Sequence, residues 1–174
     1  VTNGLLLNEE LTKRILTGGT SRIYFSVDGA SNETYNKVRK GGDFDKFHEK
    51  LAMVSRVRDE LGLTGDDVEL AFISCMMRSN VHEAPALVEL ASKYKVDALE
   101  LRYLMMTDAA EVEESEMLCY DPERADRYYD EAIALAEEKG IYLELLPERF
   151  RDIKKREGQV PSVPPYLNCG FPWN

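Results

Sequence analysis

Residues Val68–Met76 read VELAFISCM, an almost continuously apolar stretch with several residues that favour strands. Such a run is typical of a β-strand that is covered on both faces, as strands of a parallel sheet are. Outward from it, three further stretches favour strands, at Arg22–Val27, Ala98–Leu104 and Ile141–Leu146. In the last two, polar and apolar residues alternate, which indicates positions nearer a sheet edge or polar side chains that point into a barrel.

Four helical segments separate these strands, each marked by capping residues or by apolar residues three and four positions apart. They begin after Asn8, after Asp43, near Pro85 and at Asp121-Pro122, and the second and fourth end at Gly62 and Gly140. Helices that alternate with strands predict an α/β fold with parallel strands, part of a (β/α) TIM-like barrel. Because four strands do not close a barrel, we expect a partial barrel that is truncated at both ends.

The composition narrows the classes of function. The chain has 174 residues, 44% of them hydrophobic and 31% charged, which is typical of about one domain. Its 22 Lys and Arg against 32 Asp and Glu give a net charge of −10, which argues against a nucleic-acid partner. No apolar run reaches the roughly 18 residues of a membrane span. Cys75, Cys119 and Cys169 show no CxxC spacing, so neither a disulfide framework nor a self-contained metal site is expected, and the chain is predicted to be cytoplasmic.

The two ends and the C-terminal texture predict how the chain is divided. It begins with Val1 rather than Met and stops at Asn174, shortly after Cys169, so we expect a piece of a longer protein. After Leu146 a charged stretch precedes a proline-rich one, which is typical of a linker. The expected division is residues 1–147 for the partial barrel, 148–168 for a linker and 169–174 for the start of an extension.

Functional residues of parallel β/α folds lie at the carboxyl ends of the strands. After Arg22–Val27 the chain passes through Ser26-Val27-Asp28-Gly29. Ser26 and Asp28 lie on one side of the strand by its period of two, and two adjacent oxygen-bearing groups suit the hydroxyls of a sugar. An Asp-Gly turn in which Ser26 caps the backbone explains the same residues without a ligand, and the spacing alone favours that alternative.

Several short motifs occur along the chain in a recognisable order. They are Thr2-Asn3-Gly4, Ile23–Ala30 (IYFSVDGA), Glu33-Thr34-Tyr35, Val38–Phe44 (VRKGGDF) and Cys169–Trp173 (CGFPW). In this order the chain resembles the middle-to-C-terminal part of the barrel of a radical S-adenosylmethionine enzyme, followed by the start of a SPASM-type iron–sulfur extension at residues 169–174. The resemblance covers nearly the whole chain. It implies S-adenosylmethionine and a [4Fe–4S] cluster as cofactors, with Cys169 as a metal ligand of the extension.

At single positions, the resemblance implies four cofactor-binding residues. Ser26 and Asp28 would lie at the ribose and methionyl side of S-adenosylmethionine, in agreement with the interpretation that these two residues bind the hydroxyls of a sugar. Arg39 would approach the cofactor carboxylate or the substrate, because a guanidinium forms two parallel hydrogen bonds with a carboxylate. An exposed residue in an Arg-Lys-Gly-Gly turn explains Arg39 equally well. Asn80 matches a polar position near the cofactor, after Val68–Met76, and is otherwise a helix cap.

In radical S-adenosylmethionine enzymes, a CxxxCxxC loop holds the [4Fe–4S] cluster and leaves one iron open to the cofactor. This motif does not occur in the 174 residues of the chain. The resemblance therefore implies that a full-length parent reductively cleaves S-adenosylmethionine to a 5′-deoxyadenosyl radical, which abstracts hydrogen from a peptide or small-molecule substrate. A reducing electron donor such as flavodoxin or ferredoxin would be a partner, and no nucleic-acid or membrane partner is expected. This chain alone is expected to be inactive.

Two other functions stay open. An unrelated β/α barrel, such as an aldolase or a metal hydrolase, is disfavoured because no predicted strand end offers a Lys, a His pair or a carboxylate cluster. The other alternative is a non-catalytic, degenerate barrel that acts as a peptide-binding or scaffolding module. The sequence immediately upstream of Val1 would distinguish this module from the enzyme.

Overall fold

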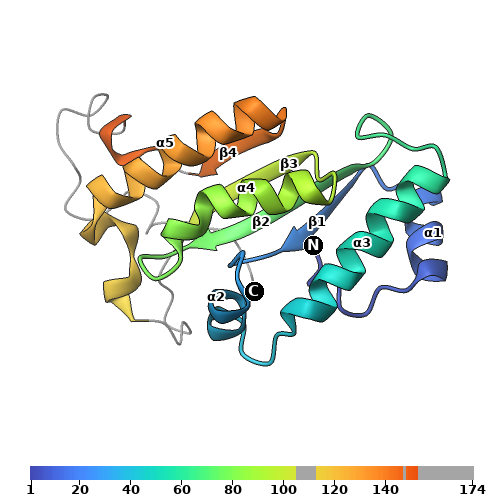
Figure 1. The fold of residues 1–174 in the computed structure, drawn as a ribbon, viewed down its shortest axis with the longest axis horizontal. Helices are drawn as coiled ribbons and strands as arrows, with labels where there is room; N and C mark the ends of the chain where they lie inside the picture. The colour runs from blue at the N-terminus through green and yellow to red at the C-terminus, as the bar shows by residue number, and fades with distance from the viewer. Residues whose placement is uncertain (105–112, 147, 153–174) are drawn as a thin grey trace, which may run out of the picture.

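The structure is a computed structural model, and it describes residues 1–104, 113–146 and 148–152. Helices and strands alternate along the chain as the sequence predicts, except that one additional helix follows the first strand (Figure 1). In order, they are α1 (Glu9–Thr17), β1 (Arg22–Ser26), α2 (Asn32–Val38), α3 (Phe44–Glu60), β2 (Glu69–Met76), α4 (Ala84–Lys93), β3 (Ala98–Tyr103), α5 (Pro122–Lys139) and β4 (Tyr142–Leu146). Short 3₁₀ helices are η1 (Val81–Glu83), η2 (Glu114–Glu116) and η3 (Leu118–Tyr120). The four predicted strands are confirmed to within one residue at each end.

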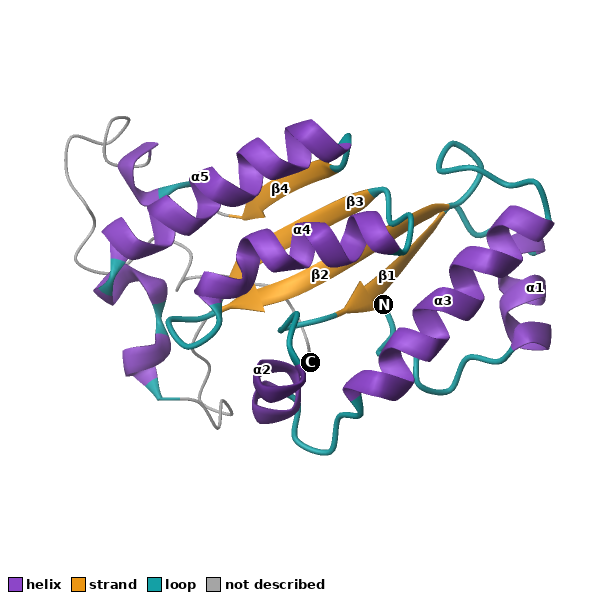
Figure 2. Ribbon diagram, viewed as in Figure 1, coloured by secondary structure: helices purple, strands orange, loops and turns teal. Residues whose placement is uncertain are grey.

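The four strands form one parallel sheet in the order β1-β2-β3-β4 (Figure 2). Their register aligns Phe25, Phe72, Leu99 and Leu143 in a row across the sheet. Each connection between neighbouring strands passes through a helix, as in β/α barrels. Thr2 adds a parallel bridge to Phe25 at the free side of β1. The predicted α/β fold with parallel strands is confirmed, and the arrangement is compatible with a partial TIM-like barrel.

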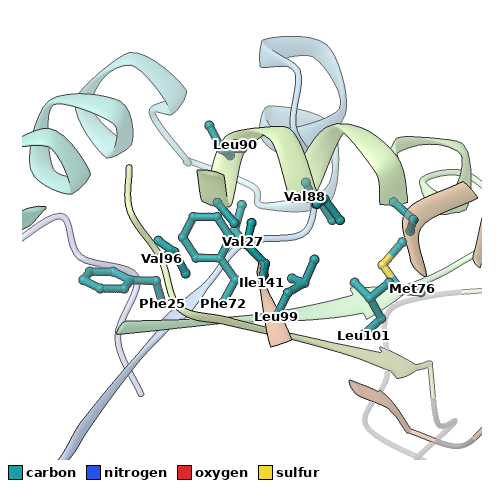
Figure 3. Close-up of a cluster of buried hydrophobic side chains, with 14 of the residues drawn as sticks. Phe25, Val27, Phe72, Met76, Val88, Leu90, Val96, Leu99, Leu101 and Ile141 are labelled. Atoms are coloured by element: carbon teal, nitrogen blue, oxygen red, sulfur yellow. The ribbon is translucent and has the colours of Figure 1, made fainter. Parts of the chain in front are cut away.

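The main hydrophobic core lies between the sheet and helices α3, α4 and α5, which share one face of the sheet (Figure 1). Phe25, Phe72 and Leu99 extend from the strands into this layer, and Val88 of α4 belongs to the same cluster (Figure 3). All four side chains are completely buried. Burying one such side chain contributes about 2 kcal/mol, so this layer is the main source of stability.

Capping residues set the ends of most helices. Asn8 and Asp43 accept hydrogen bonds from backbone N–H groups in the first turns of α1 and α3, as predicted. Gly140 ends α5 in the left-handed conformation, with φ of 68°. At the other end of α5, Asp121 makes no side-chain capping bond. The sequence prediction therefore placed this helix correctly, with proline rather than the aspartate side chain marking its start.

Helix α2 is an element that the sequence prediction missed. Its seven residues read NETYNKV, and Tyr35 is the buried residue among them. Ser31 caps it by accepting a hydrogen bond from Thr34 N at 3.2 Å. A single apolar anchor gives no helical periodicity, which explains why the sequence pattern did not reveal the helix.

The opposite face of the sheet carries polar side chains. Arg22 donates to the Tyr24 hydroxyl at 2.7 Å, the Tyr24 hydroxyl donates to Glu100, and Arg102 donates to Glu100 at 2.7 Å. No helix of the described ranges packs on this face (Figure 2). The expectation that β2 is covered on both faces is correct for the helical side only, because Ile73 on the other side is half-buried.

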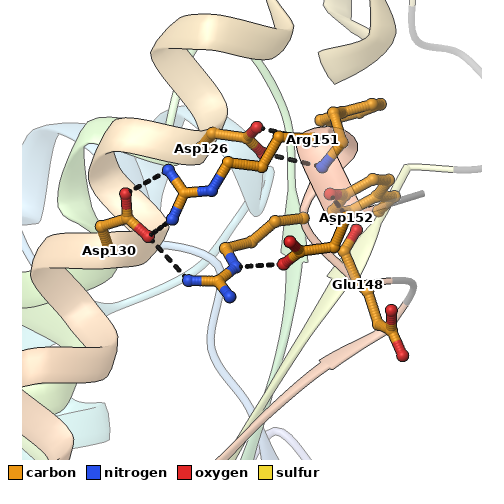
Figure 4. A network of polar contacts seen from close by, with 8 residues as sticks. Asp126, Asp130, Glu148, Arg151 and Asp152 are labelled. Carbon is orange, nitrogen blue, oxygen red and sulfur yellow. Dashed lines mark hydrogen bonds and ion pairs between the residues drawn. The ribbon is translucent and has the colours of Figure 1, made fainter. Parts of the chain in front are cut away.

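Residues 148–152, the start of the predicted linker, pack against α5 (Figure 4). Asp126 accepts hydrogen bonds from Phe150 N at 2.8 Å and from Arg151 N at 2.9 Å. Asp130 pairs with the two arginines of this segment. Phe150 is buried and stacks on Tyr103, with 4.8 Å between ring centroids. Residues 148–152 are therefore held against the helical layer.

Candidate functional site

The loop after β1 carries the first of the predicted site residues. Val27 N donates to Ile73 O at 3.0 Å, which continues the pairing with β2 beyond β1 and places Asp28 at the carboxyl end of the sheet. Asp28 is only 8% exposed. Gly29 is required next, because a Cβ there would lie 2.6 Å from Tyr35 N, where α2 passes. The glycine of the Asp28-Gly29 pair thus permits the close approach of α2.

The Asp28 carboxylate has two partners from different elements. Its Oδ1 accepts a hydrogen bond from Cys75 N at 2.7 Å, and its Oδ2 forms an ion pair with Arg39 NH2 at 2.7 Å. Arg39 is the C-cap of α2, where its backbone N–H donates to Tyr35 O at 2.9 Å. Two partners fixed by regular structure give the carboxylate a single orientation.

Asn80 connects the ends of β1 and β2. It is 1% exposed, and its Nδ2 donates to Asp28 O and to Cys75 O, both at 2.9 Å. Its Oδ1 accepts from Met77 N at 2.7 Å. Asn80 is also the N-cap of η1, but its side chain makes no capping bond there. Because both amide protons are engaged, Asn80 positions Asp28 and offers no free N–H donor of its side chain to a ligand.

A cavity of about 380 Å³ opens beside the Asp28–Arg39 pair. Its wall is formed by Asn3, Leu5, Asp28, Tyr35, Val38, Arg39, Lys40, Gly41 and Gly42. The Arg39 side chain is 26% exposed, and its Nε has no hydrogen-bond partner among the described residues. Gly42 is needed in this wall, because a Cβ there would lie 2.8 Å from Arg39 O and 2.9 Å from the Tyr35 ring. The cavity thus presents a held guanidinium to a ligand with an anionic group.

Ser26 does not join this cluster. Its backbone N–H donates to Thr2 O at 2.9 Å, its side chain is half-buried, and it is not part of the cavity wall. Its predicted role therefore stays a prediction, whereas Asp28, Arg39 and Asn80 are joined directly.

Glu83 belongs to this end of the sheet, and the sequence analysis missed it. Its carboxylate accepts hydrogen bonds from Ala30 N, Ser31 N, Ser31 Oγ and Thr34 Oγ1. Burial alone would raise the pKa of Glu83, but these hydrogen bonds together outweigh burial and lower it. The donors lie 49 to 53 residues away along the chain, so no local pattern could have indicated the contact.

The cysteines provide no metal site in the described part of the molecule. Cys169 lies outside the described residues, so the predicted iron ligand remains a prediction. Burial raises the pKa of Cys75 to about 12 and also raises the pKa of Cys119, which keeps both thiols protonated. Over residues 1–104, 113–146 and 148–152, no three His, Cys, Asp or Glu side chains gather as a metal-binding group.

Comparison with known sequences identifies two relatives. A GTP 3′,8-cyclase from Syntrophomonas wolfei is 26% identical over 171 residues, which is 97% of this chain and 49% of that protein. An AdoMet-dependent heme synthase from Methanosarcina barkeri is 28% identical over 167 residues, which is 93% of this chain and 44% of that protein. The chain therefore spans about half the length of the curated relatives it matches. No protein-family model matches it.

Comparison with solved structures identifies the same fold in other proteins. SuiB from Streptococcus suis superposes with a TM-score of 0.65 over 93% of this chain and 35% of that one, at 11% identity. A structure of SuiB bound to S-adenosylmethionine gives 0.61 over 83% and 31%, at 12% identity. The structure of anSMEcpe with bound AdoMet gives 0.59 over 93% and 43%, at 15% identity. At such identities these matches establish the fold alone.

The sequence relatives and the structural neighbours agree with each other. They are radical S-adenosylmethionine enzymes, and each of them covers most of this chain. Of the motifs that carried the resemblance, Ser26-Val27-Asp28-Gly29 lies at the carboxyl end of β1. The predicted resemblance to the radical S-adenosylmethionine enzymes is therefore confirmed, as a similarity in sequence to the two relatives and in fold to the solved structures.

Proposed function

We propose that the chain is the middle-to-C-terminal part of the barrel of a radical S-adenosylmethionine enzyme and holds the methionyl end of that cofactor. The observation that carries the proposal is the Asp28–Arg39 ion pair, which borders a cavity of about 380 Å³ at the carboxyl end of the sheet. The Methanosarcina barkeri relative is named an AdoMet-dependent heme synthase, and structures of SuiB and anSMEcpe with the cofactor bound are known.

The residues around the cavity fit this ligand. Small-molecule sites typically have volumes of about 300–1,000 Å³, and this cavity falls within that range. A guanidinium carries five N–H donors, and Asp28 engages Arg39 through one nitrogen, NH2. The remaining donors match the cofactor carboxylate. Ser26, two residues before Asp28 on the same side of the chain, is assigned to the ribose hydroxyls.

Each of these side chains has a separate task in the proposed site. Arg39 binds the carboxylate through charge-assisted hydrogen bonds, and Asp28 keeps the guanidinium turned toward the cavity. Asn80 in turn fixes the backbone of Asp28. When bound, S-adenosylmethionine and a [4Fe–4S] cluster supply a 5′-deoxyadenosyl radical for hydrogen abstraction. The described residues of this chain orient the cofactor for that step.

The proposal extends to substrate, partner and location. A peptide or protein is the proposed substrate, with a small molecule as the alternative, and a reductant such as flavodoxin or ferredoxin is the proposed electron donor. The resemblance of residues 169–174 to the start of a SPASM-type extension supports the peptide. Cysteine usage without disulfide spacing supports a cytoplasmic location. Over the described ranges, no helix combines the length and apolar character needed to cross a membrane.

A first experiment tests whether the chain depends on a cluster loop from elsewhere. Its three cysteines include no CxxxCxxC motif, so we propose that it neither assembles the [4Fe–4S] cluster nor cleaves S-adenosylmethionine alone. The purified chain is reconstituted with iron and sulfide, and its absorbance and cofactor turnover are measured. A cluster with one open iron on this chain would contradict the proposed inactivity.

A second experiment tests the cofactor site itself. In the full-length protein, Asp28→Asn should raise the dissociation constant for S-adenosylmethionine about tenfold, which corresponds to about 1.4 kcal/mol, and Ser26→Ala should raise it less. Asp126→Asn is the matched control, because Asp126 is a buried aspartate that also accepts backbone hydrogen bonds but lies on α5. Unchanged affinity in both site variants would remove Ser26 and Asp28 from the site.

A further inference from the structure

Glu83 ends η1, in the connection between β2 and α4, and is 8% exposed. Its partners belong to a different connection, the one that leads from β1 through α2. Its Oε2 accepts from Ala30 N at 2.6 Å and from Ser31 N at 3.3 Å. Its Oε1 accepts from Ser31 Oγ at 2.5 Å and from Thr34 Oγ1 at 2.7 Å. One carboxylate thus gathers the backbone and the hydroxyls at the start of α2.

The segment that Glu83 holds joins two residues of the proposed cofactor site. Asp28 lies two residues before Ala30, and Arg39 is the C-cap of α2, which Ser31 begins. The position of α2 relative to the sheet therefore decides whether Arg39 reaches the Asp28 carboxylate. The segment packs tightly against α2 at Gly29, because a Cβ there would lie 2.6 Å from Tyr35 N.

Asn80 and Glu83 act on this segment from the same turn after β2. Asn80 donates to Asp28 O, before the glycine, and Glu83 accepts from Ala30 N, after it. The two side chains therefore fix the backbone on both sides of Gly29. Neither contact uses the Asp28 carboxylate or the Arg39 guanidinium, so both of these groups stay available to each other and to the cavity.

The charge of Glu83 is part of the arrangement. Four donor groups converge on one side chain, and a carboxylate provides acceptors only, on both oxygens. A glutamine would present donors from its amide nitrogen on one side. Hydrogen bonds to an ionised acceptor are roughly twice as strong as those between neutral groups, which favours a carboxylate over an amide here.

We infer that Glu83 is a positioning residue for the proposed S-adenosylmethionine site: it sets the geometry of the Asp28–Arg39 pair through residues 29–34 without touching the ligand. This inference rests on the proposed function. Its observational basis is the set of four hydrogen bonds from the start of α2 to a carboxylate that is almost fully buried.

The test combines two readouts on Glu83→Ala and Glu83→Gln. Amide hydrogen exchange at Ala30 and Ser31, measured on this chain, reports the contact directly. The dissociation constant for S-adenosylmethionine, measured on the full-length protein, reports the consequence. We expect faster exchange in both variants, affinity about tenfold weaker in E83A and about threefold weaker in E83Q. Glu33→Gln is the matched control, because Glu33 is an exposed glutamate in the first turn of α2 and should leave both readouts unchanged.

A double-substitution cycle separates positioning from a general loss of stability. If Glu83 acts through Arg39, E83A should weaken affinity less than about twofold in a background that already carries Arg39→Met. A merely structural role would lower affinity by the same factor in both backgrounds and would overturn the inference. If E83A does not fold, E83Q takes its place in the cycle.

The outcomes distinguish the two proposals. If the unsubstituted protein does not bind S-adenosylmethionine, the proposed function is wrong and this inference falls with it. If the unsubstituted protein binds the cofactor and the Glu83 variants bind it equally well, the inference about Glu83 is wrong while the proposed function stands. If affinity falls together with faster exchange at Ala30, and not in E33Q, both are supported.

Discussion

Each end of the sheet holds an arginine paired with an aspartate, and the two pairs are built differently. At the carboxyl end, Arg39 contacts Asp28 beside the cavity. At the amino end, Arg58 of α3 contacts Asp97, which directly precedes β3. The Arg58 side chain is 5% exposed, whereas that of Arg39 is 26% exposed.

The surroundings of Arg58 supply further acceptors. It donates to Val68 O at 3.3 Å and to Lys95 O at 2.5 Å, in addition to Asp97. Asp97 also accepts from Leu70 N at 2.8 Å. This pair therefore ties the end of α3 to the starts of β2 and β3. For Arg39, by contrast, Asp28 is the one ion-pair partner within the described ranges.

The difference teaches that an Arg–Asp pair does not by itself indicate a binding site. Both arginines have a buried Nε without a hydrogen-bond partner among the residues that the structure describes, so that feature does not separate them. The two arginines differ in the surroundings of their guanidinium groups. The terminal nitrogens of Arg58 donate to backbone carbonyls, whereas Arg39 forms part of the cavity wall. We therefore expect the amino-end pair to affect folding and the carboxyl-end pair to affect ligand binding.

The largest effect is expected from Arg58→Met. This change keeps the aliphatic stem but leaves Asp97 and two backbone carbonyls without their donor, and breaking a buried pair costs about 3 kcal/mol of unfolding free energy. Urea denaturation followed by circular dichroism measures the loss. Arg56→Met, at an exposed position of the same helix, is the control and should cost less than about 1 kcal/mol. Equal losses in the two variants would contradict the comparison.

The second largest effect is expected from Asn80→Ala. It removes three hydrogen bonds from a residue that is 1% exposed and leaves Met77 N unpaired, at a cost of about 2 kcal/mol. The same denaturation experiment measures it, with Asn36→Ala at an exposed position of α2 as the control. If the Asn80 variant were as stable as this control, the described connection between β1 and β2 would be wrong.

A smaller effect should follow the protonation of Glu83. Because its pKa is lowered in the folded state, its stabilisation is present above the ordinary glutamate pKa of about 4.3 and is lost as pH falls through the folded value. Nearby His82, whose Nε2 lies 4.0 Å from Glu83 Oε1, is the other titratable group to consider. Unfolding free energies of wild type and E83Q should differ by about 1 kcal/mol at pH 7 and converge as pH falls through the lowered folded pKa of Glu83. A difference that is constant from pH 7 to pH 3 would show that the charge is unimportant.

The smallest effect on stability should come from Arg39→Met, the counterpart of Arg58→Met. One partly exposed ion pair is worth less than about 1 kcal/mol. The same change should raise the dissociation constant for S-adenosylmethionine at least about tenfold, because the guanidinium is the proposed carboxylate donor. Isothermal titration of the full-length protein measures this. If Arg39→Met lowers stability as much as Arg58→Met and leaves affinity unchanged, the two pairs have the same role and the comparison fails.

Most of the fold was predictable from the sequence because its signals are local. The apolar stretch Val68–Met76 and the caps Asn8 and Asp43 each act within one element, and each appears as predicted. Helix α2 was not predictable, because seven mostly polar residues, with Tyr35 as the buried one among them, carry no periodicity.

The site was predictable in part only. Asp28, Arg39 and Asn80 were candidates, two of them on a resemblance, but their mutual contacts depend on where α2 lies. The contacts of Glu83, like the contact of Arg58 with Asp97 at the other end of the sheet, join residues more than thirty positions apart. Long-range contacts of single polar side chains leave no pattern in one sequence.

The polar face of the sheet has a consequence for how a barrel of this kind can be filled. The interior of an ordinary TIM barrel is a dry, packed core of branched aliphatic side chains. Here Tyr24, Glu100 and Arg102 occupy that side of the sheet and satisfy one another. Charged groups retain their hydration shells wherever space allows, because removing that water is expensive. The interior bounded by this sheet is therefore suited to hold water or a polar ligand rather than to form a dry hydrophobic core.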